Sequence, residues 1–269
     1  MEEKFVDVNG IKTRYFEEGK GAPIILIHGG GAGADSFGNW RGCFPLLAPK
    51  FRVIAVDMVG FGHTDKPDPA TYEYSQPARN KHIAGFIEAL KLGKASLVGN
   101  SMGGCTSLGV AITRPELVDK LVLMGAAAVR APISEELMVI MRFAPNRENM
   151  EKLVLALTGS DFKLDPKMVE YRLSLVQEPG TMTAYSAVMK WIGGQGGLFH
   201  QEEDIVKVKH KSLILGGKQD KVVPPESNWR LSQLLDNSWL HLIPHCGHWA
   251  MIEKPAEFSE VTSWFLTNT

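Results

Sequence analysis

The chain has 269 residues, of which 44% are hydrophobic and 22% charged, and its formal net charge is −1. A near-neutral chain without a basic run does not favour nucleic acid as a partner, and no apolar stretch approaches the ~20 residues that cross a bilayer. Three cysteines, Cys43, Cys105 and Cys246, are too few for a disulfide framework. We therefore expect a cytoplasmic protein with one large domain, or a domain with an insertion.

The first 125 residues alternate strand-like and helix-like segments. A hairpin is predicted at residues 4–19, because Asn9-Gly10 is a strong signal for a tight turn. Residues 75–93 have apolar side chains at helical spacing and end at Gly93, which we expect to cap the helix. Short apolar runs predict strands covered on both faces within residues 23–30, 51–62, 95–100 and 118–125. This alternation predicts a parallel sheet with helices on both sides.

Residues 131–208 interrupt the alternation. Helical patterns without an intervening strand occur at 133–144, 146–160, 166–177 and 181–194. Strands and helices alternate again from residue 211 onwards. We therefore predict an α/β core, residues 1–130 and 209–269, and a helical lid, residues 131–208. The lid is expected over the carboxyl edge of the sheet, where open α/β sheets bind ligands.

The pentapeptide Gly99-Asn100-Ser101-Met102-Gly103 fits the pattern G-x-S-x-G, with a predicted strand before it and a predicted helix after it. A strand that turns sharply into a helix exposes the serine hydroxyl at the helix N-terminus. Backbone N–H groups favour developing negative charge there. The pattern therefore predicts Ser101 as a nucleophile. A serine that only caps the helix is the alternative.

A serine nucleophile needs a base and an acid that orients the base. The expected chain order is serine, acid, histidine. Asp220 follows the strand-like run "KSLILGGKQ", and His248 lies beyond the last predicted strand in "PHCGHW". The other place for an acid holds Gly125-Ala126-Ala127, which offers no carboxylate. We therefore predict Ser101, Asp220 and His248 as the catalytic residues.

The run "HGGGAG", at residues 28–33, follows another predicted strand. Successive glycines let backbone N–H groups point into a site. The amides of Gly30 and Met102 are therefore predicted to hold an oxyanion, and such a donor typically stabilises a transition state by about 3–4 kcal/mol.

Three histidines, His241, His245 and His248, have spacings that a metal site could use. The predicted strand directs His241 and His245 along one face, whereas His248 falls in the following turn and is already assigned to the triad. We therefore predict no metal site, and the catalytic residues require no cofactor.

Four segments, "HGGGAGADSFGNWR", "GNSMGG", "GKQDKVVP" and "PHCGHWAMIE", together resemble the meta-cleavage product hydrolases of the α/β-hydrolase superfamily. The resemblance extends from about Val8 to Phe265. Ala32, where biphenyl-type members have proline, is similar to the carbazole branch of the family. The resemblance implies a mostly parallel eight-stranded sheet with helices on both faces and a helical lid inserted after the sixth strand.

This resemblance also implies an activity. Members cut a carbon–carbon bond in 2-hydroxy-6-oxohexa-2,4-dienoates, which are ring-fission products of aromatic compounds. The products are 2-hydroxypenta-2,4-dienoate and a carboxylic acid. The resemblance further suggests a homo-oligomer, a dimer or larger.

Residues that would bind the substrate are implied by the same resemblance. Asn39 and Asn100 match residues that contact the dienoate end, and Arg172 matches an arginine that binds the substrate carboxylate. Trp249 would line that side. Gly29 is a further expected substrate contact. The group beyond C6 is expected to lie against lid residues such as Trp191, Leu198 and Phe199, together with Met138 or Met141.

Two other functions fit the same residues. A carboxylesterase could use the same triad on esters, and a ligand-binding receptor could retain the fold and the triad without turnover. Epoxide hydrolases and haloalkane dehalogenases share the fold but place aspartate at the position of Ser101, which argues against both.

Overall fold

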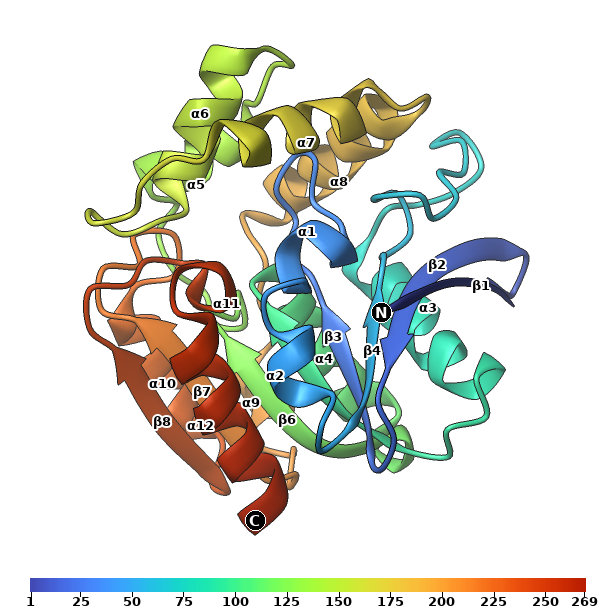
Figure 1. The fold of residues 1–269 in the computed structure, drawn as a ribbon, viewed down its shortest axis with the longest axis vertical. Coiled ribbons are helices and arrows are strands. Elements are labelled where there is room, and N and C mark those ends of the chain that lie inside the picture. The colour runs from blue at the N-terminus through green and yellow to red at the C-terminus, as the bar shows by residue number, and fades with distance from the viewer.

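A single eight-stranded sheet runs through the middle of the computed structural model, which describes residues 1–269 (Figure 1). The strands are β1 (Glu2–Val8), β2 (Ile11–Glu18), β3 (Pro23–Ile27), β4 (Arg52–Val56), β5 (Ala95–Asn100), β6 (Val118–Met124), β7 (Ser212–Gly217) and β8 (Ser238–Ile243). Their order in the sheet is β1-β2-β4-β3-β5-β6-β7-β8. Only β2 pairs antiparallel, with β1 and β4, and all other neighbours are parallel. The predicted mostly parallel sheet is confirmed.

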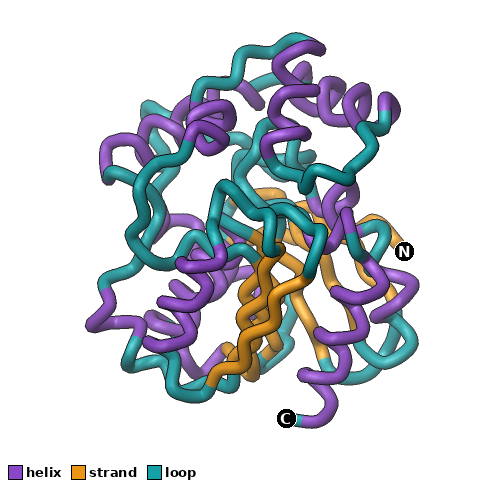
Figure 2. The backbone as a smooth tube through the Cα atoms, turned by 90° about the vertical axis from the view of Figure 1, so that its left-hand side faces the viewer, coloured by secondary structure: helices purple, strands orange, loops and turns teal.

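Helices cover both faces of this sheet (Figures 1 and 2). They are α1 (Ser36–Trp40), α2 (Phe44–Leu47), α3 (Gln76–Ala89), α4 (Met102–Thr113), α9 (Glu202–Ile205), α10 (Pro225–Leu234), α11 (Ala250–Glu253) and α12 (Pro255–Asn268), with a 3-10 turn at η1 (Pro115–Leu117). Helices α4 and α10 lie on one face, and α2 and α12 lie on the other. Every residue of β5 and β7 is consequently buried, which explains why these strands are apolar runs without alternation. No helix combines the length and the apolar character that crossing a membrane requires.

A second group of helices follows β6 and precedes β7. They are α5 (Glu135–Met141), α6 (Arg147–Ala156), α7 (Pro166–Gln177) and α8 (Thr181–Gln195). In both views they lie beyond the end of the sheet at which the parallel strands finish. Helix α7 has the predicted bounds, because Asp165 accepts a hydrogen bond from the Lys167 N–H and Pro166 occupies the first turn. The division into a core and a lid at residues 131–208 stays a prediction.

Two local turns illustrate how the sequence sets the chain direction. Asn9 and Gly10, at φ values of 55° and 84°, form the tight turn predicted between β1 and β2. The expectation for Gly93 is wrong. Helix α3 ends earlier, with Lys91 in the left-handed conformation, and the N–H groups of Lys91 and Leu92 bond to the carbonyls of Glu88 and Ile87. These two bonds already satisfy the helix end, so the glycine is not needed as its cap.

Candidate active site

Ser101 occupies the sharp turn between β5 and α4. Its backbone has φ 55° and ψ −117°, a strained conformation that costs on the order of 1–3 kcal/mol. The flanking glycines permit the turn, because a Cβ atom on Gly103 would lie 2.3 Å from the Ile27 carbonyl oxygen and one on Gly99 would lie 2.3 Å from the Gly103 carbonyl oxygen. The Ser101 side chain makes no capping hydrogen bond to α4. The alternative that this serine serves as a helix cap is therefore wrong.

Asp220 and His248 form a buried hydrogen-bonded pair, although they follow different strands, β7 and β8. Nδ1 of His248 lies 2.7 Å from Oδ2 of Asp220. The other carboxylate oxygen, Oδ1, accepts hydrogen bonds from the N–H groups of Val222 and Val223. Asp220 accepts a hydrogen bond from Nδ1–H of His248. Because Nδ1 therefore carries the ring proton, Nε2 is assigned as the unprotonated nitrogen.

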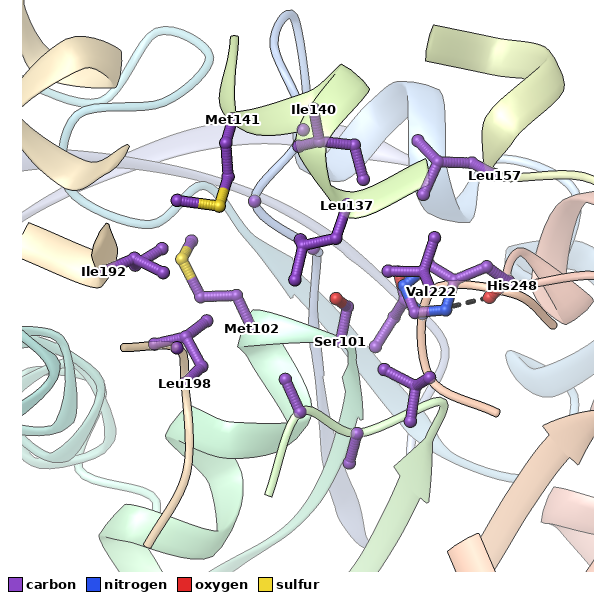
Figure 3. Close-up of a pocket in the computed structure, with 18 of the residues that line it drawn as sticks. Ser101, Met102, Leu137, Ile140, Met141, Leu157, Ile192, Leu198, Val222 and His248 are labelled. Carbon is purple, nitrogen blue, oxygen red and sulfur yellow. Dashed lines mark hydrogen bonds between the residues drawn. The ribbon is translucent and has the colours of Figure 1, made fainter. Parts of the chain in front are cut away.

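Ser101 and His248 both line the same cavity (Figure 3). Nε2 of His248 is buried and has no hydrogen-bond partner. Its lone pair is therefore available to a proton donor inside the cavity. The Ser101 hydroxyl is not bonded to Nε2 here. Catalytic hydrogen bonds are often longer without substrate and shorten when substrate binds.

Gly125 lies against the histidine–aspartate pair, a role that sequence reasoning missed. A Cβ atom at this position would lie 3.0 Å from Nδ1 of His248 and 3.1 Å from Oδ2 of Asp220. Gly125 also has a positive φ of 49°. The sequence at this position, Gly125-Ala126-Ala127, indicates only that no carboxylate is present. The structure shows that a side chain here would press on the pair.

The glycine loop after β3 approaches the turn at Ser101. A Cβ atom on Gly29 would lie 2.8 Å from Oδ1 of Asn100, and one on Gly30 would lie 3.0 Å from the Met102 sulfur. His28 is fully buried and holds the loop in place. Its Nδ1 bonds to the Gly29 carbonyl at 2.7 Å, and its Nε2 accepts a hydrogen bond from the Met58 N–H at 3.0 Å. The predicted oxyanion residues, Gly30 and Met102, are thus neighbours beside the serine.

Arg172 is a buried cation that pairs with no carboxylate. It is 3% exposed, its Nη2 donates to the Ala32 carbonyl at 2.7 Å, and its Nε has no partner. The guanidinium carbon lies 4.8 Å from the ring centroid of Trp249. Burial lowers the pKa of Arg172 to about 10, so the group still carries its charge at neutral pH. An unpaired buried charge of this kind can bind an anionic ligand.

Asn39 and Asn100 also contribute unpaired polar atoms to the cavity. Both side chains are buried, and Oδ1 of each has no hydrogen-bond partner. The Asn100 Nδ2 group donates to the carbonyls of Met124 and His248, which fixes the orientation of its amide. Buried polar atoms are normally paired, so these two carbonyl oxygens are available to donors on a ligand.

The rest of the cavity is mostly apolar: 18 of its 30 lining residues are hydrophobic. The apolar side chains labelled in Figure 3 include Leu137, Ile140 and Met141 of α5, Ile192 of α8, Met102 of α4, Leu157 after α6, and Val222 and Leu198 in the loops after β7 and α8. Phe199 lines it as well, so the expectations for Met141, Leu198 and Phe199 agree with the geometry.

Trp191 and Met138 were expected to contact the group beyond C6, and the structure does not place them there. Neither residue lines the cavity. On α8, Met189 and Ile192 face the cavity, so Trp191 lies on a different face, where its ring covers the guanidinium of Arg79 at 5.5 Å. Met138 similarly points away from the side of α5 that carries Leu137 and Met141 and borders an outer groove.

The other two histidines have separate partners. His241 Nε2 lies 3.3 Å from a Glu257 oxygen, and His245 Nδ1 lies 3.6 Å from an Asp161 oxygen. With His248 bound to Asp220, the three imidazoles do not converge on one point, and no group of three or more potential metal ligands is present.

Comparison with known proteins gives this site its context. The family model described as alpha/beta hydrolase fold matches residues 22–255. The chain is 51% identical, over 98% of its own length and 91% of the other, to 2-hydroxy-6-oxo-6-(2'-aminophenyl)hexa-2,4-dienoic acid hydrolase of Metapseudomonas resinovorans. It is 35% identical, over 98% and 95%, to 2-hydroxy-6-oxo-2,4-heptadienoate hydrolase of Pseudomonas putida.

Solved structures agree with these relatives. The crystal structure of a serine hydrolase involved in carbazole degradation, the CarC enzyme, superposes with a TM-score of 0.92 at 49% identity and covers 99% of both chains. The meta-cleavage product hydrolase CumD from Pseudomonas fluorescens superposes equally well, with a TM-score of 0.92 at 36% identity over 98% and 97%. The chain therefore belongs to the alpha/beta hydrolase fold family and, within it, to the meta-cleavage product hydrolases.

Proposed function

We propose that the chain is a serine-dependent hydrolase of 2-hydroxy-6-oxohexa-2,4-dienoates, with Ser101, Asp220 and His248 as its catalytic triad. The observation that carries this proposal is the unpaired guanidinium of Arg172, buried in the same cavity as the serine. An ester without a charged group gives no reason to keep a buried cation that forms no ion pair at this place. A substrate with a carboxylate does, because a guanidinium matches a carboxylate in both charge and geometry.

The glycine loop after β3 passes close to both Ser101 and Arg172. A Cβ atom on Gly29 would lie 3.4 Å from Cβ of Ser101, and a Cβ atom on Gly31 would lie 3.2 Å from Nη2 of Arg172. The two glycines are two residues apart and therefore at most about 7 Å from each other. Carbon atoms C1 to C6 of an extended dienoate span about 6 Å, with bonds of about 1.5 Å. These limits are compatible with a dienoate that places its C1 carboxylate against Arg172 and its C6 carbonyl beside Ser101.

The first chemical step converts the dienol into a ketone, because carbon is otherwise a poor leaving group. The 2-hydroxyl loses its proton and C5 gains one. We assign this transfer to His248, whose Nε2 faces the cavity without a partner. Arg172, Asn39 and Asn100 stabilise the charge at the carboxylate end while the double bonds shift. General acid–base catalysis of this kind contributes about 10²–10⁴-fold in rate.

The second step is attack on the C6 carbonyl. His248 takes the Ser101 proton, the serine oxygen bonds to C6, and the amides of Gly30 and Met102 hold the resulting oxyanion. Cleavage of the C5–C6 bond leaves an acyl-enzyme and a dienolate, which takes up a proton and departs as 2-hydroxypenta-2,4-dienoate. Water, activated by His248, then adds to the acyl-enzyme and releases a carboxylic acid and the free serine.

The apolar part of the cavity would hold the group attached to C6. Its aliphatic and methionine side chains suit an aromatic or alkyl substituent. The relative with 51% identity is named for a 2'-aminophenyl substrate, and we propose an aryl substituent for this chain as well. A panel of ring-fission products with phenyl, aminophenyl and methyl groups, followed by loss of the yellow dienolate absorbance, measures this preference.

The decisive experiment compares two substrate classes in the Arg172→Ala variant. We expect dienoate cleavage to fall by at least tenfold, while hydrolysis of a p-nitrophenyl ester, which has no carboxylate, stays close to that of the parent. Equal losses on both substrates, or no loss on either, would instead favour a carboxylesterase. A protein that reacts once with a serine-directed probe but turns over neither substrate would be a receptor.

We propose that residues 131–208 form a lid over this chemistry. Helices α5 and α8 supply cavity-lining residues such as Leu137 and Ile192, and α7 supplies Arg172. Proteolysis with and without bound dienoate measures this role, because a lid that closes on substrate becomes protected.

We also propose a homo-oligomer that assembles through β8. This strand ends the sheet and has no acidic residue, lysine or arginine, and Trp239 on it is 41% exposed. The opposite edge, β1, carries Glu2, Glu3, Lys4 and Asp7, the charges that usually prevent strand pairing. Light scattering should give a dimer or larger assembly for the parent and a monomer for Trp239→Lys. A monomeric parent would contradict the proposal.

A cytoplasmic location is the remaining proposal. All three cysteines are buried and free, as is usual in a reducing compartment. Fractionation of the native host, with activity measured in each fraction, tests it.

A further inference from the structure

The carboxylate of Asp35 joins three separate elements, β2, α1 and α7. Its Oδ1 accepts a hydrogen bond from the N–H of Gly38 in α1 at 2.7 Å. Its Oδ2 accepts one from Nη2 of Arg14 on β2 at 2.7 Å, and one from the hydroxyl of Tyr171 on α7 at 2.5 Å. Asp35 is fully buried, so water does not compete for these bonds. One side chain thus connects the sheet, α1 and α7.

Two of these elements, α7 and α1, carry residues that we propose bind the substrate. Arg172 directly follows Tyr171 on α7, and Asn39 lies on α1, where its N–H donates to the Asp35 carbonyl at 3.3 Å. Both Arg172 and Asn39 line the cavity. Asp35 is therefore linked through short covalent and hydrogen-bonded paths to two polar groups at the dienoate end.

The packing between these elements leaves no free space. A Cβ atom on Gly33 would lie 2.4 Å from the Arg172 carbonyl oxygen, and one on Gly38 would lie 2.9 Å from Cε1 of Tyr171. The Tyr171 ring also packs on Phe37, with ring centroids 5.9 Å apart. Helix α7 therefore rests directly on the loop after β3, and the hydrogen bond from Tyr171 to Asp35 lies at this contact.

The sheet anchors this contact from below. Arg14 donates from Nε to Oδ2 of Asp57 at 2.7 Å, and Asp57 accepts a hydrogen bond from the Ser36 N–H at 2.7 Å. Arg14 and Asp57 are both fully or almost fully buried. Asp35 is thus held by a charged partner on the rigid sheet, and it can in turn fix the hydroxyl of a residue on α7.

We propose that Asp35 and Tyr171 are positioning residues that align Arg172 and Asn39 for the carboxylate end of the substrate. The inference rests on the proposed function, because it assumes that this end of the cavity binds a carboxylate. Neither residue lines the cavity, so both act through the groups they hold. Positioning of this kind affects a substrate that needs Arg172 and leaves untouched one that does not.

The experiment uses Tyr171→Phe, which removes one hydroxyl and keeps the ring on Phe37. Tyr74→Phe is the matched control, because the Tyr74 hydroxyl also donates one hydrogen bond, to the Pro67 carbonyl at 2.7 Å. Two quantities are measured in parallel. One is kcat and KM for a dienoate and for a p-nitrophenyl ester. The other is the calorimetric Kd of the dienoate for the Ser101→Ala protein with and without Tyr171→Phe.

We expect Tyr171→Phe to raise KM and Kd for the dienoate about tenfold, the value of one hydrogen bond of ordinary strength. Its kcat should change less, and its ester hydrolysis should stay within about twofold, as should every value for Tyr74→Phe. An unchanged Kd, or equal losses on dienoate and ester, would overturn the inference. If the parent binds the dienoate but does not cleave it, the proposed reaction fails, and the Kd comparison still decides the positioning role.

Discussion

A methyl group on Gly125 would lie 3.0 Å from Nδ1 of His248, the atom that bonds to Asp220. In Gly125→Ala this contact, together with the positive φ of 49°, should displace the imidazole by a few tenths of an ångström or more. Misplacement of a catalytic group by about 1 Å can cost 10²-fold in rate. We therefore expect kcat to fall between tenfold and about 100-fold, measured by dienolate decay.

Gly194→Ala on α8 is the control for that variant. A Cβ atom there would meet nothing within 4 Å, and Gly194 does not have a positive φ. Alanine should stabilise the helix by about 0.5–1 kcal/mol and leave kcat unchanged. If Gly125→Ala kept kcat within twofold of the parent, the close contact with the pair would have no catalytic consequence.

Ser101 should show a conflict between stability and activity. Its φ of 55° is unfavourable for any side chain with a Cβ atom. Ser101→Ala and Ser101→Gly should both lose turnover by about 10²–10⁴-fold while still binding dienoate. Only Ser101→Gly should also raise the free energy of unfolding, by about 1 kcal/mol, because it removes the strained Cβ atom. Chemical denaturation compares the two, and equal stabilities would mean that the turn is not strained.

Arg172 should show a similar conflict. A buried cation without a carboxylate destabilises the folded chain, so Arg172→Met should raise the free energy of unfolding by about 1–2 kcal/mol. The same change should lower kcat/KM for a dienoate by at least tenfold. Arg79→Met is the matched control for the loss of kcat/KM. Arg79 is also buried without a carboxylate partner, but it lies outside the cavity, so its replacement should leave kcat/KM for the dienoate unchanged. A less stable Arg172→Met protein would contradict the cost we assign to the cation.

Two buried histidines should make the fold sensitive to acid. Burial, with a smaller contribution from the neighbouring His28, lowers the pKa of His82 to about 4, and burial also lowers the pKa of His28. Nδ1 of His82 accepts the Val59 N–H, and Nε2 of His28 also accepts a backbone N–H, so both rings must stay neutral. Between pH 4 and 6.5 the unfolded chain binds more protons than the folded chain. Stability is therefore present above pH 6.5 and is lost as pH falls towards 4, by about 3 kcal/mol for His82.

Urea denaturation at several pH values between 4 and 7 measures this loss. His82→Gln, which keeps a donor near Thr13, should reduce the dependence on pH. His63 is exposed, so His63→Gln should leave the dependence unchanged. A stability that stays flat over this range would show that neither buried ring needs to be neutral.

The sequence could predict those elements whose signals are local. Helix α7 was predicted to the residue because a cap and a proline mark its start. The apolar runs identified the buried strands, and the order of motifs brought together Ser101, Asp220 and His248, which share one end of the sheet. Arg172 came from the family resemblance, because its helical pattern alone fits an exposed face equally well.

Features that depend on distant partners were not predictable in this way. The phase of α8 decides whether Trp191 or Ile192 faces the cavity, and it depends on what the helix packs against. The five-residue α1 has too little sequence pattern of its own, and its cap, Asp35, depends on Arg14 and Tyr171, 21 and 136 residues away. Such contacts are properties of the fold rather than of any segment.

The close contact of Gly33 and Gly38 with α7 has a consequence for protein engineering. Chimeras that exchange residues 131–208 between relatives, in order to change the accepted substrate, would import a foreign α7 onto an unchanged loop. Even one larger side chain on either partner would shift the guanidinium. Successful exchanges should therefore include the segment from Gly33 to Asn39 together with the helices above it.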